Sequence, residues 1–133
     1  MFSIIIATYQ RADKKTPVFL KRALNSIFAQ SYDDFKVYVI GDKYEDDNEL
    51  QNIVKEYPKE KLYCKNLPNA VEREKYIDNK KALWCSGGVN AVNYGIKISL
   101  EDGFEYICHL DHDDYWFPNH LEVINECINV TGA

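Results

Sequence analysis

The stretch Tyr106-Ile-Cys-His-Leu-Asp-His-Asp-Asp-Tyr-Trp-Phe-Pro118 changes abruptly from apolar to acidic. Its apolar part ends at Leu110, and three of the next four residues are aspartates, namely Asp111, Asp113 and Asp114. The pattern predicts a buried strand that carries these acids at its carboxyl end, followed by a helix that begins at about the proline. If the acids lie in an extended segment, Asp111 and Asp113 point to the same side.

Acids at the carboxyl end of a strand often face a ligand, because the ligand crevice of an open α/β sheet lies there. Neighbouring carboxylates repel one another, and a divalent cation that bridges them to an anionic substrate makes the cluster favourable. The alternative is an acidic turn that is only solvated, or that interacts with the dipole of the next helix. The aromatic residues Tyr115 and Trp116 beside the acids favour a ligand site, since a solvated turn does not need them.

Length and composition limit the class of protein. The chain has 133 residues, 46% of them apolar and 14% aromatic, which indicates one folded domain over residues 1–133. Its net charge of −5 argues against a nucleic-acid-binding protein. No apolar run reaches the roughly 18 residues that a transmembrane segment needs, and the apolar N-terminus is too short for a signal peptide.

The cysteines are scattered along the chain and form no C-x-x-C pair. This spacing argues against a disulfide framework or a zinc site and indicates thiols in a reducing compartment. We therefore expect a cytoplasmic protein that lies, at most, peripherally at the inner face of the membrane. The sequence leaves the oligomeric state open.

Apolar and amphipathic segments alternate along the chain. Continuous apolar runs predict strands at 2–8, 35–41, 61–65 and 105–110. Helical spacing of apolar residues predicts helices at 16–30, from about 47 to 57, at 86–103 and after 118. The alternation implies an α/β fold, a three-layer α/β/α sandwich with a mainly parallel central sheet.

Local expectations accompany this assignment. Thr16 before Pro17 predicts the N-cap of the first helix. No periodicity holds over residues 66–81, which we interpret as a mobile loop that orders on ligand binding or as structural filler. The helix at 86–103 is expected to bury the stripe Val89, Val92, Ile96 and Leu100.

Polar residues follow three of the predicted strands, at Thr8-Tyr9, at Asp42 and at the acids 111–114. Parallel strands place these ends at one edge of the sheet, so we expect the side chains to form one site. His109 precedes the acids and is expected to pack between the sheet and a helix. Strand alternation also allows it to face the same way as Asp111.

The same residues, taken in order, resemble glycosyltransferase family 2, which has the GT-A fold of nucleotide-diphospho-sugar transferases. Four segments carry the resemblance: an opening strand, a helix end of the form S-x-x-x-Q-[ST]-[YF], a second strand that ends in acid, and an L-D-x-D-D-x-x-x-P metal motif. They are Ser3–Arg11, Ser26–Tyr32, Val39–Asp42 and Leu110–Pro118. The resemblance covers essentially the whole chain, and the ordered combination is specific although each piece alone is weak.

The resemblance implies an inverting transfer of a sugar from a nucleotide diphosphate donor, usually a uridine one, with Mn²⁺ or Mg²⁺. The acceptor is a saccharide, a lipid-linked molecule or a protein, as in cell-surface polysaccharide biosynthesis. Asp42 is implied to bind the base, whose imide N–H suits an acceptor-only carboxylate, and Asp113 is implied to ligate the metal. The other residues implied to bind the nucleotide sugar are Ala7, Thr8, Tyr9, Arg11, Asn93, Asp111 and His112.

The chain departs from the family pattern at several positions. The second strand ends in Gly41-Asp42, where two acids are frequent, so one carboxylate is left to bind the nucleoside. Val92 replaces the arginine of a frequent A-R-N triplet, which leaves Arg73, Lys80 or Lys81 as substitutes beside the diphosphate. His112 stands at the variable position of the metal motif, where it is either a bystander or a ligand or proton carrier.

The chain ends one predicted helix after the metal motif. Members of the family continue with an acceptor-binding half that contains the catalytic base. We therefore expect the C-terminal half to be truncated or absent, the general base to lie beyond the chain end, and little transfer by this chain alone.

Other functions remain open from the residues alone. His109 and Asp111 allow a metal-dependent hydrolase, although the sequence supplies no further ligands for such a site. A nucleotide-binding module without chemistry of its own is the second alternative. A Rossmann dehydrogenase is disfavoured, because no G-x-G-x-x-G follows the first strand.

Overall fold

Four parallel strands form the sheet in the computed structural model, which describes residues 1–133. They are β1 (Phe2–Thr8), β2 (Phe35–Asp42), β3 (Leu62–Leu67) and β4 (Tyr106–His109), in the order β3-β2-β1-β4. β2 and β4 pair with opposite sides of β1. The order of strands therefore reverses at β1, and open α/β sheets bind ligands at such switch points.

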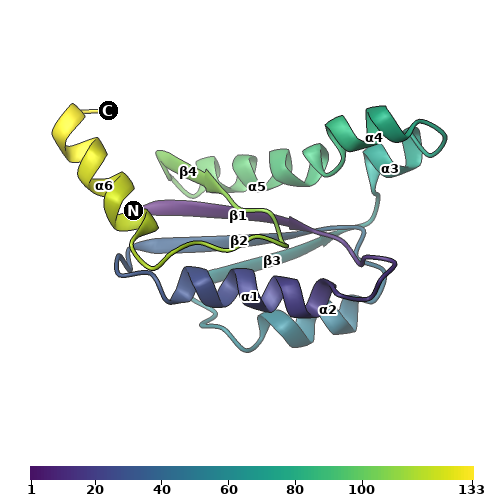
Figure 1. The fold of residues 1–133 in the computed structure, drawn as a ribbon, viewed down its shortest axis with the longest axis horizontal. Helices are drawn as coiled ribbons and strands as arrows, with labels where there is room; N and C mark the ends of the chain where they lie inside the picture. The colour runs from purple at the N-terminus through teal and green to yellow at the C-terminus, as the bar shows by residue number, and fades with distance from the viewer.

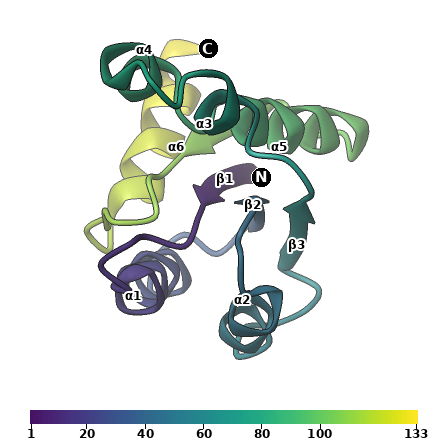
Figure 2. The ribbon, with the colours of Figure 1, turned by 90° about the vertical axis from the view of Figure 1, so that its right-hand side faces the viewer.

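Helices cover both faces of the sheet, as Figure 1 shows. α1 (Thr16–Phe28) and α2 (Asp47–Val54) lie on one face, and α5 (Val89–Glu101) lies on the other. The short helices α3 (Val71–Lys75) and α4 (Lys80–Ser86) lie on the α5 side, near the carboxyl ends of the strands, which face the viewer in Figure 2. The three layers confirm the predicted α/β/α sandwich. None of the helices has both the length and the apolar composition of a membrane span.

The sheet divides the core into two apolar clusters. Ile4 and Ile6 of β1 belong to the cluster on the side of α1 and α2, whereas Ile5 between them belongs to the cluster on the side of α5. All three side chains are fully buried. Side chains alternate between the faces of a strand, and both faces are covered here, which explains why this strand is a continuous apolar run.

The buried side of α5 consists of small residues, Ala91, Gly95 and Ser99. A Cβ atom on Gly95 would lie 2.7 Å from Cγ2 of Ile5, so the helix lies very close to the sheet at this point. Ser99 Oγ and Ser3 Oγ form a buried hydrogen bond between helix and strand. Close contact between a helix and a sheet requires small side chains, and these residues supply them.

The predicted apolar stripe of this helix is therefore wrong. Val89 and Leu100 are exposed, and Val92 and Ile96 are only partly buried. Apolar periodicity locates the large side chains of a helix, but the face that contacts this sheet is the one without them.

Residues 66–81 are not an irregular loop, as the sequence suggested. They contain the end of β3, the helix α3 and the start of α4. In α3 only Glu72 is buried, and in α4 no residue is. Hydrogen bonds stabilise these helices instead; for example, Asn79 Oδ1 accepts from the amide of Ala82 at 3.0 Å. Helices without a buried apolar face carry no periodicity from which they can be predicted.

The N-cap of α1 is Lys15, and Thr16 is already the first residue of the helix. The predicted cap is therefore wrong by one residue. The buried Thr16 hydroxyl donates to the carbonyl of Tyr9 and accepts from the amide of Arg11, both at 2.9 Å. It closes the loop after β1 instead of capping the helix.

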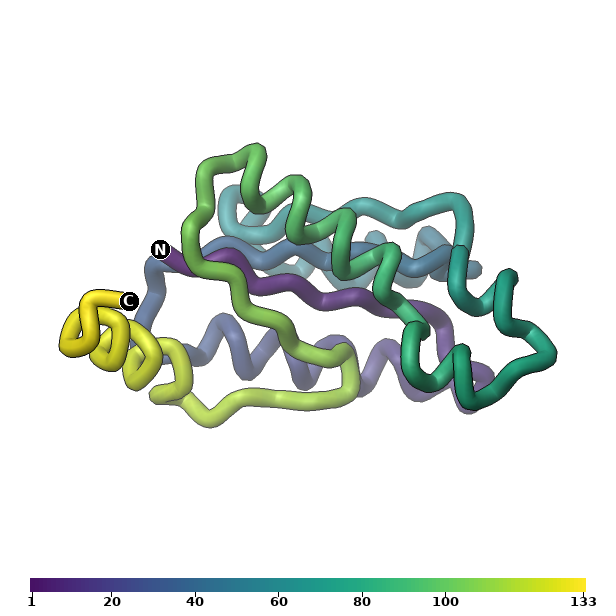
Figure 3. Tube along the Cα trace, turned by 90° about the horizontal axis from the view of Figure 1, so that it is seen from above, coloured from purple at the N-terminus to yellow at the C-terminus, as the bar shows by residue number.

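The segment after β4 runs back along α1 to α6 (His120–Thr131), as Figure 3 shows from above. Gln30, two residues after the end of α1, is 8% exposed. Its amide donates to the carbonyl of Phe117 at 2.7 Å and accepts from the amide of Leu121 at 2.9 Å. The glutamine therefore fixes the backbone that follows the acids 111–114, and α6 begins two residues after Pro118.

Candidate functional site

A cleft of about 600 Å³ opens at the carboxyl ends of β1, β2 and β4. Most residues predicted to bind nucleotide sugar or metal line this cleft, namely Ala7, Thr8, Tyr9, Arg11, Asp42, Asp111, His112 and Asp113. The parallel register brings them together, because Thr8 lies beside Gly41, next to Asp42. Asn93 is not among them; it is exposed on α5, and its neighbour Val92 lines the cleft.

One part of the cleft, which we call the Asp42 region, consists of Thr8, Tyr9, Asp42 and Arg73. Asp42 is 2% exposed, and its Oδ1 has no hydrogen-bond partner. Its Oδ2 lies 3.5 Å from Nε of Arg73, which also donates to the Asp42 carbonyl through Nη2. Burial raises the pKa of Asp42, while the nearby Arg73 lowers it and Glu72 raises it further. An unpartnered buried oxygen is rare in proteins and marks a place where a ligand can donate.

His112 is buried beside the same region, at 7% exposure. Its Nδ1 lies 2.8 Å from Oγ1 of Thr8, and its ring stacks on Tyr9 with 5.2 Å between the ring centroids. Burial lowers the pKa of His112 and favours the neutral imidazole. His112 therefore attaches the segment 111–114 to the end of β1.

The ring of Tyr9 is the exposed aromatic surface of the Asp42 region, with 39% of the residue accessible. The guanidinium carbon of Arg73 lies 5.0 Å from the centroid of this ring. A planar ligand entering the region would therefore meet an aromatic face, a guanidinium group and a carboxylate together.

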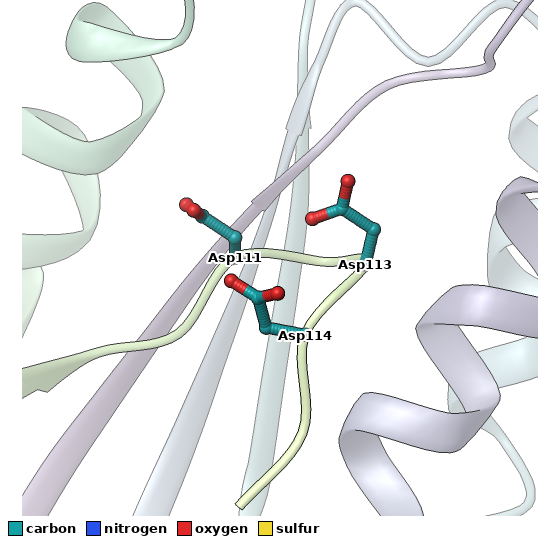
Figure 4. Close-up of side chains that lie close together, drawn as sticks. All are labelled: Asp111, Asp113 and Asp114. Atoms are coloured by element: carbon teal, nitrogen blue, oxygen red, sulfur yellow. The ribbon is translucent and has the colours of Figure 1, made fainter.

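The second part of the cleft is the acidic turn, residues Asp111–Asp114 (Figure 4). The amide of Asp114 donates to the carbonyl of Asp111 at 3.1 Å, so the segment is a turn and not the extended segment expected. Carboxylate oxygens of Asp111, Asp113 and Asp114 nevertheless lie within 4.8 Å of one another, and all three residues are exposed. A set of ligands that consists only of oxygen atoms suits Mg²⁺ and Mn²⁺.

Two arginines hold Asp113 in place. Arg11 Nη1 lies 3.4 Å from Oδ2 of Asp113, and Arg22 Nη2 donates to the Asp113 carbonyl at 2.6 Å. His109 is exposed rather than packed under a helix, contrary to expectation, because β4 is an edge strand and ends there. Its Nε2 lies 3.5 Å from Oδ1 of Asp111.

Packing against β3 explains why a glycine, Gly41, precedes Asp42. A Cβ atom at Gly41 would collide with Asn66 of β3. The amide group of Asn66 accepts from the backbone amide of Tyr44 and donates to its carbonyl, both at 2.9 Å. A second acid at position 41, as the family often has, would displace this amide group.

Several residues of the cleft were missed or only suggested by sequence. Arg73 and Lys80 both line it, whereas Lys81 does not. The wall formed by α4 and the start of α5 was not predicted and contains Leu83, Trp84, Gly87 and Gly88. The one available signal in the sequence was Trp84, a large aromatic residue outside every predicted strand and apolar helix stripe; in the structure it is 89% exposed.

The chain is 39% identical over 121 residues to the uncharacterized glycosyltransferase R139 of Acanthamoeba polyphaga mimivirus, covering 91% of this chain and 48% of that protein. It is 33% identical over 121 residues to the succinoglycan biosynthesis protein ExoW of Rhizobium meliloti (strain 1021), covering 90% of this chain and 31% of that protein. The chain thus spans half of the length of these relatives or less.

Solved structures agree in fold. TarS 1–349 of S. aureus in complex with UDP superposes with a TM-score of 0.71 at 22% identity, over 97% of this chain and 32% of that one. The mannosyltransferase PcManGT of Pyrobaculum calidifontis, in complex with GDP-Man and Mn²⁺, superposes with a TM-score of 0.56 at 18% identity, over 86% of this chain and 28% of that one. These likenesses confirm the predicted GT-A fold. A family model described as Glycosyl transferase family 2 matches residues 3–132, and the chain therefore belongs to this family.

Proposed function

We propose that this chain binds the donor of an inverting, metal-dependent glycosyltransferase, and that the donor is a uridine diphosphate sugar. The observation that carries the proposal is the unpartnered, buried Oδ1 of Asp42 in the same cleft as the acidic turn. One group suits the base of a nucleotide, and the other suits a metal ion with its diphosphate.

The Asp42 region has the chemistry that uracil requires. The imide N–H of uracil is a donor, and an ionised carboxylate can only accept. Arg73 beside Asp42 supplies donors for a neighbouring carbonyl, and Tyr9 supplies an aromatic face for stacking. TarS binds UDP in the structure that resembles this one, which is consistent with a uridine donor.

The acidic turn has the chemistry that a hard divalent ion requires, and the exposed Asp111 and Asp113 both line the cleft. Asp113 would hold Mn²⁺ or Mg²⁺, and Asp111 would lie toward the ribose and first phosphate. When bound, the ion supplies Lewis-acid stabilisation of the departing diphosphate. Arg11 and Lys80 line the same cleft and add positive charge for the phosphates.

The acceptor belongs to a wider proposal. ExoW and the amylovoran biosynthesis glycosyltransferase AmsB of Erwinia amylovora are named for polysaccharide synthesis. We infer by analogy an acceptor from a cell-surface polysaccharide pathway, free or lipid-linked, for the whole enzyme of which this part binds the donor. The cysteines are free, which is consistent with a cytoplasmic location.

The test is calorimetric titration of uridine and of UDP against wild type and Asp42→Asn. The amide replaces one acceptor oxygen by a donor that cannot pair with an imide N–H, so both affinities should fall roughly tenfold or more. Asp33→Asn is the matched control, because Asp33 is exposed and outside the cleft. Unchanged uridine affinity in Asp42→Asn would exclude base recognition by Asp42. Stabilisation of the protein by Mn²⁺ alone, without any effect of nucleotide, would favour a hydrolase.

A further inference from the structure

A second buried carboxylate, Glu72 of α3, lies outside the cleft lining. It is 8% exposed. Its Oε1 accepts from the backbone amide of Asn90 at 2.6 Å, and its Oε2 is buried without any hydrogen-bond partner. Burying a carboxylate is unfavourable unless it is paired, so its retention here calls for a structural or functional reason.

The hydrogen bond to Asn90 caps α5 from outside the helix. The first amides of a helix have no partner within it, and α5 begins after Gly88, which has no side chain to supply one. Glu72 provides the acceptor from a different element, and its negative charge also suits the positive end of the helix. Gly88 itself lines the cleft, so Glu72 fixes the backbone of one cleft wall.

The residue after Glu72 is Arg73, which contacts Asp42 and Tyr9. The next residue, Glu74, forms an ion pair with Lys43, which directly follows Asp42 in the sequence. Lys43 Nζ lies 3.0 Å from Oε1 of Glu74. The short helix α3 is therefore attached to α5 by Glu72 and to the end of β2 by Glu74. Between the two attachments, Arg73 is directed at Asp42.

We propose that Glu72 is a positioning residue of the nucleotide site: it clamps α3 to the start of α5 and thereby sets Arg73 against Asp42. The role rests on the proposed function of Asp42 as the group that binds the base. It also places a second carboxylate near Asp42 from α3, whereas β2 has no room for one at Gly41. The charged groups acting on Asp42 are Arg73, which lowers its pKa, and Glu72 and Glu74, which raise it.

The test compares Glu72→Ala, which removes the hydrogen bond and the charge, with Glu72→Gln, which keeps an acceptor and removes only the charge. Uridine is the probe, so that the metal and phosphates do not contribute. Glu72→Ala should weaken uridine binding roughly tenfold, whereas Glu72→Gln should keep most of the wild-type affinity for uridine at neutral pH. Asp46→Ala is the matched control, since it removes the acidic cap of α2, on the opposite face of the sheet from α3 and α5, and should leave uridine affinity unchanged.

A second readout does not depend on any ligand. The pKa of the Asp42 carboxyl, measured by ¹³C NMR, should be lower in Glu72→Gln than in wild type, because a negative neighbour has been neutralised. Glu72→Ala removes the same charge but also releases α3, so the pKa of Asp42 should be higher in Glu72→Ala than in Glu72→Gln, because Arg73 no longer faces the carboxylate. A cap that does not position Arg73 would give the two variants the same value. Equal Asp42 pKa values in Glu72→Ala and Glu72→Gln, or equal loss of uridine affinity in Glu72→Ala and Asp46→Ala, would overturn the proposal. If wild type fails to bind uridine or UDP, the base-binding role of Asp42 fails, and the NMR titrations of the two variants still decide whether Glu72 sets Arg73 against Asp42.

Discussion

The Asp42 region and the acidic turn lie in one cleft but differ in exposure to water. The side chain of Asp42 is 3% exposed, whereas those of Asp111 and Asp113 are 63% and 44% exposed. Burial raises the pKa of Asp42, and water screens the acids of the turn from one another. The buried carboxylate is held by neighbours before any ligand arrives.

This difference indicates that the Asp42 region and the acidic turn contribute to binding in different ways. A buried, preformed acceptor discriminates between bases, because a wrong base leaves it unpaired at high cost. An exposed set of acids binds a hard ion weakly by itself, because such ions keep most of their water until phosphates replace it. Selectivity for the base is therefore expected from the Asp42 region, and mutual dependence of metal and diphosphate from the acidic turn.

The largest expected effect concerns this mutual dependence. In wild type, Mn²⁺ should strengthen UDP binding on the order of 10- to 100-fold, and UDP should strengthen Mn²⁺ binding by the same factor. Asp113→Ala should abolish the enhancement in both directions and leave the weak, metal-independent binding through Tyr9 and Asp42. Titrations of UDP with and without Mn²⁺ measure it.

Asp114→Ala is the control for that experiment. Asp114 belongs to the same acidic turn and carries the same charge but does not line the cleft. It should keep most of the enhancement. A full enhancement in Asp113→Ala, or its complete loss in Asp114→Ala, would show that the ion is held elsewhere on the turn.

A smaller effect is expected at the junction of the two regions, where Thr8 and His112 form a buried hydrogen bond. Thr8→Val keeps the shape but leaves the His112 Nδ1 atom without its partner, which should cost about 1–3 kcal/mol of unfolding free energy. Urea denaturation measures this cost. Thr131→Val removes a hydroxyl that donates to a carbonyl in an exposed helix end and should change stability by less than about 0.5 kcal/mol. Equal losses of unfolding free energy in Thr8→Val and Thr131→Val would mean that the hydrogen bond between Thr8 and His112 contributes no more to stability than an exposed one.

The smallest effect concerns stability against pH. The pKa of Asp42 is raised in the folded state, so its contribution to stability is complete below the ordinary aspartate range and is lost as pH rises through the folded value. Asp42→Asn should therefore be more stable than wild type at pH 7, and the difference should shrink toward pH 4. Asp102 has the opposite sign, because the hydrogen bond from Tyr38 lowers its pKa. Asp102→Asn should therefore lose stability at pH 7, and thermal melts at both pH values compare the two variants.

Much of the fold could be predicted, because strong apolar runs lie where strands are buried on both faces. Phe2–Thr8 and Phe35–Asp42 are such runs, and their carboxyl ends were correctly expected to meet. The helices α3 and α4 could not be predicted, because polar contacts and not an apolar face stabilise them. The buried face of α5 was assigned to the wrong residues, because close packing on Ile5 selects small side chains that leave no apolar signal.

By itself, the sequence determined which residues end the strands, and therefore that Thr8, Asp42 and Asp113 share one edge of a parallel sheet. Strand direction is a local property of apolar pattern and connection, so it can be read along the chain. Only the tertiary structure decided that His112 is buried on Thr8, that Arg73 faces Asp42, and that Glu72 reaches Asn90. The partners in these contacts are 104, 31 and 18 residues apart, and long-range contacts of polar side chains carry no periodicity in the sequence.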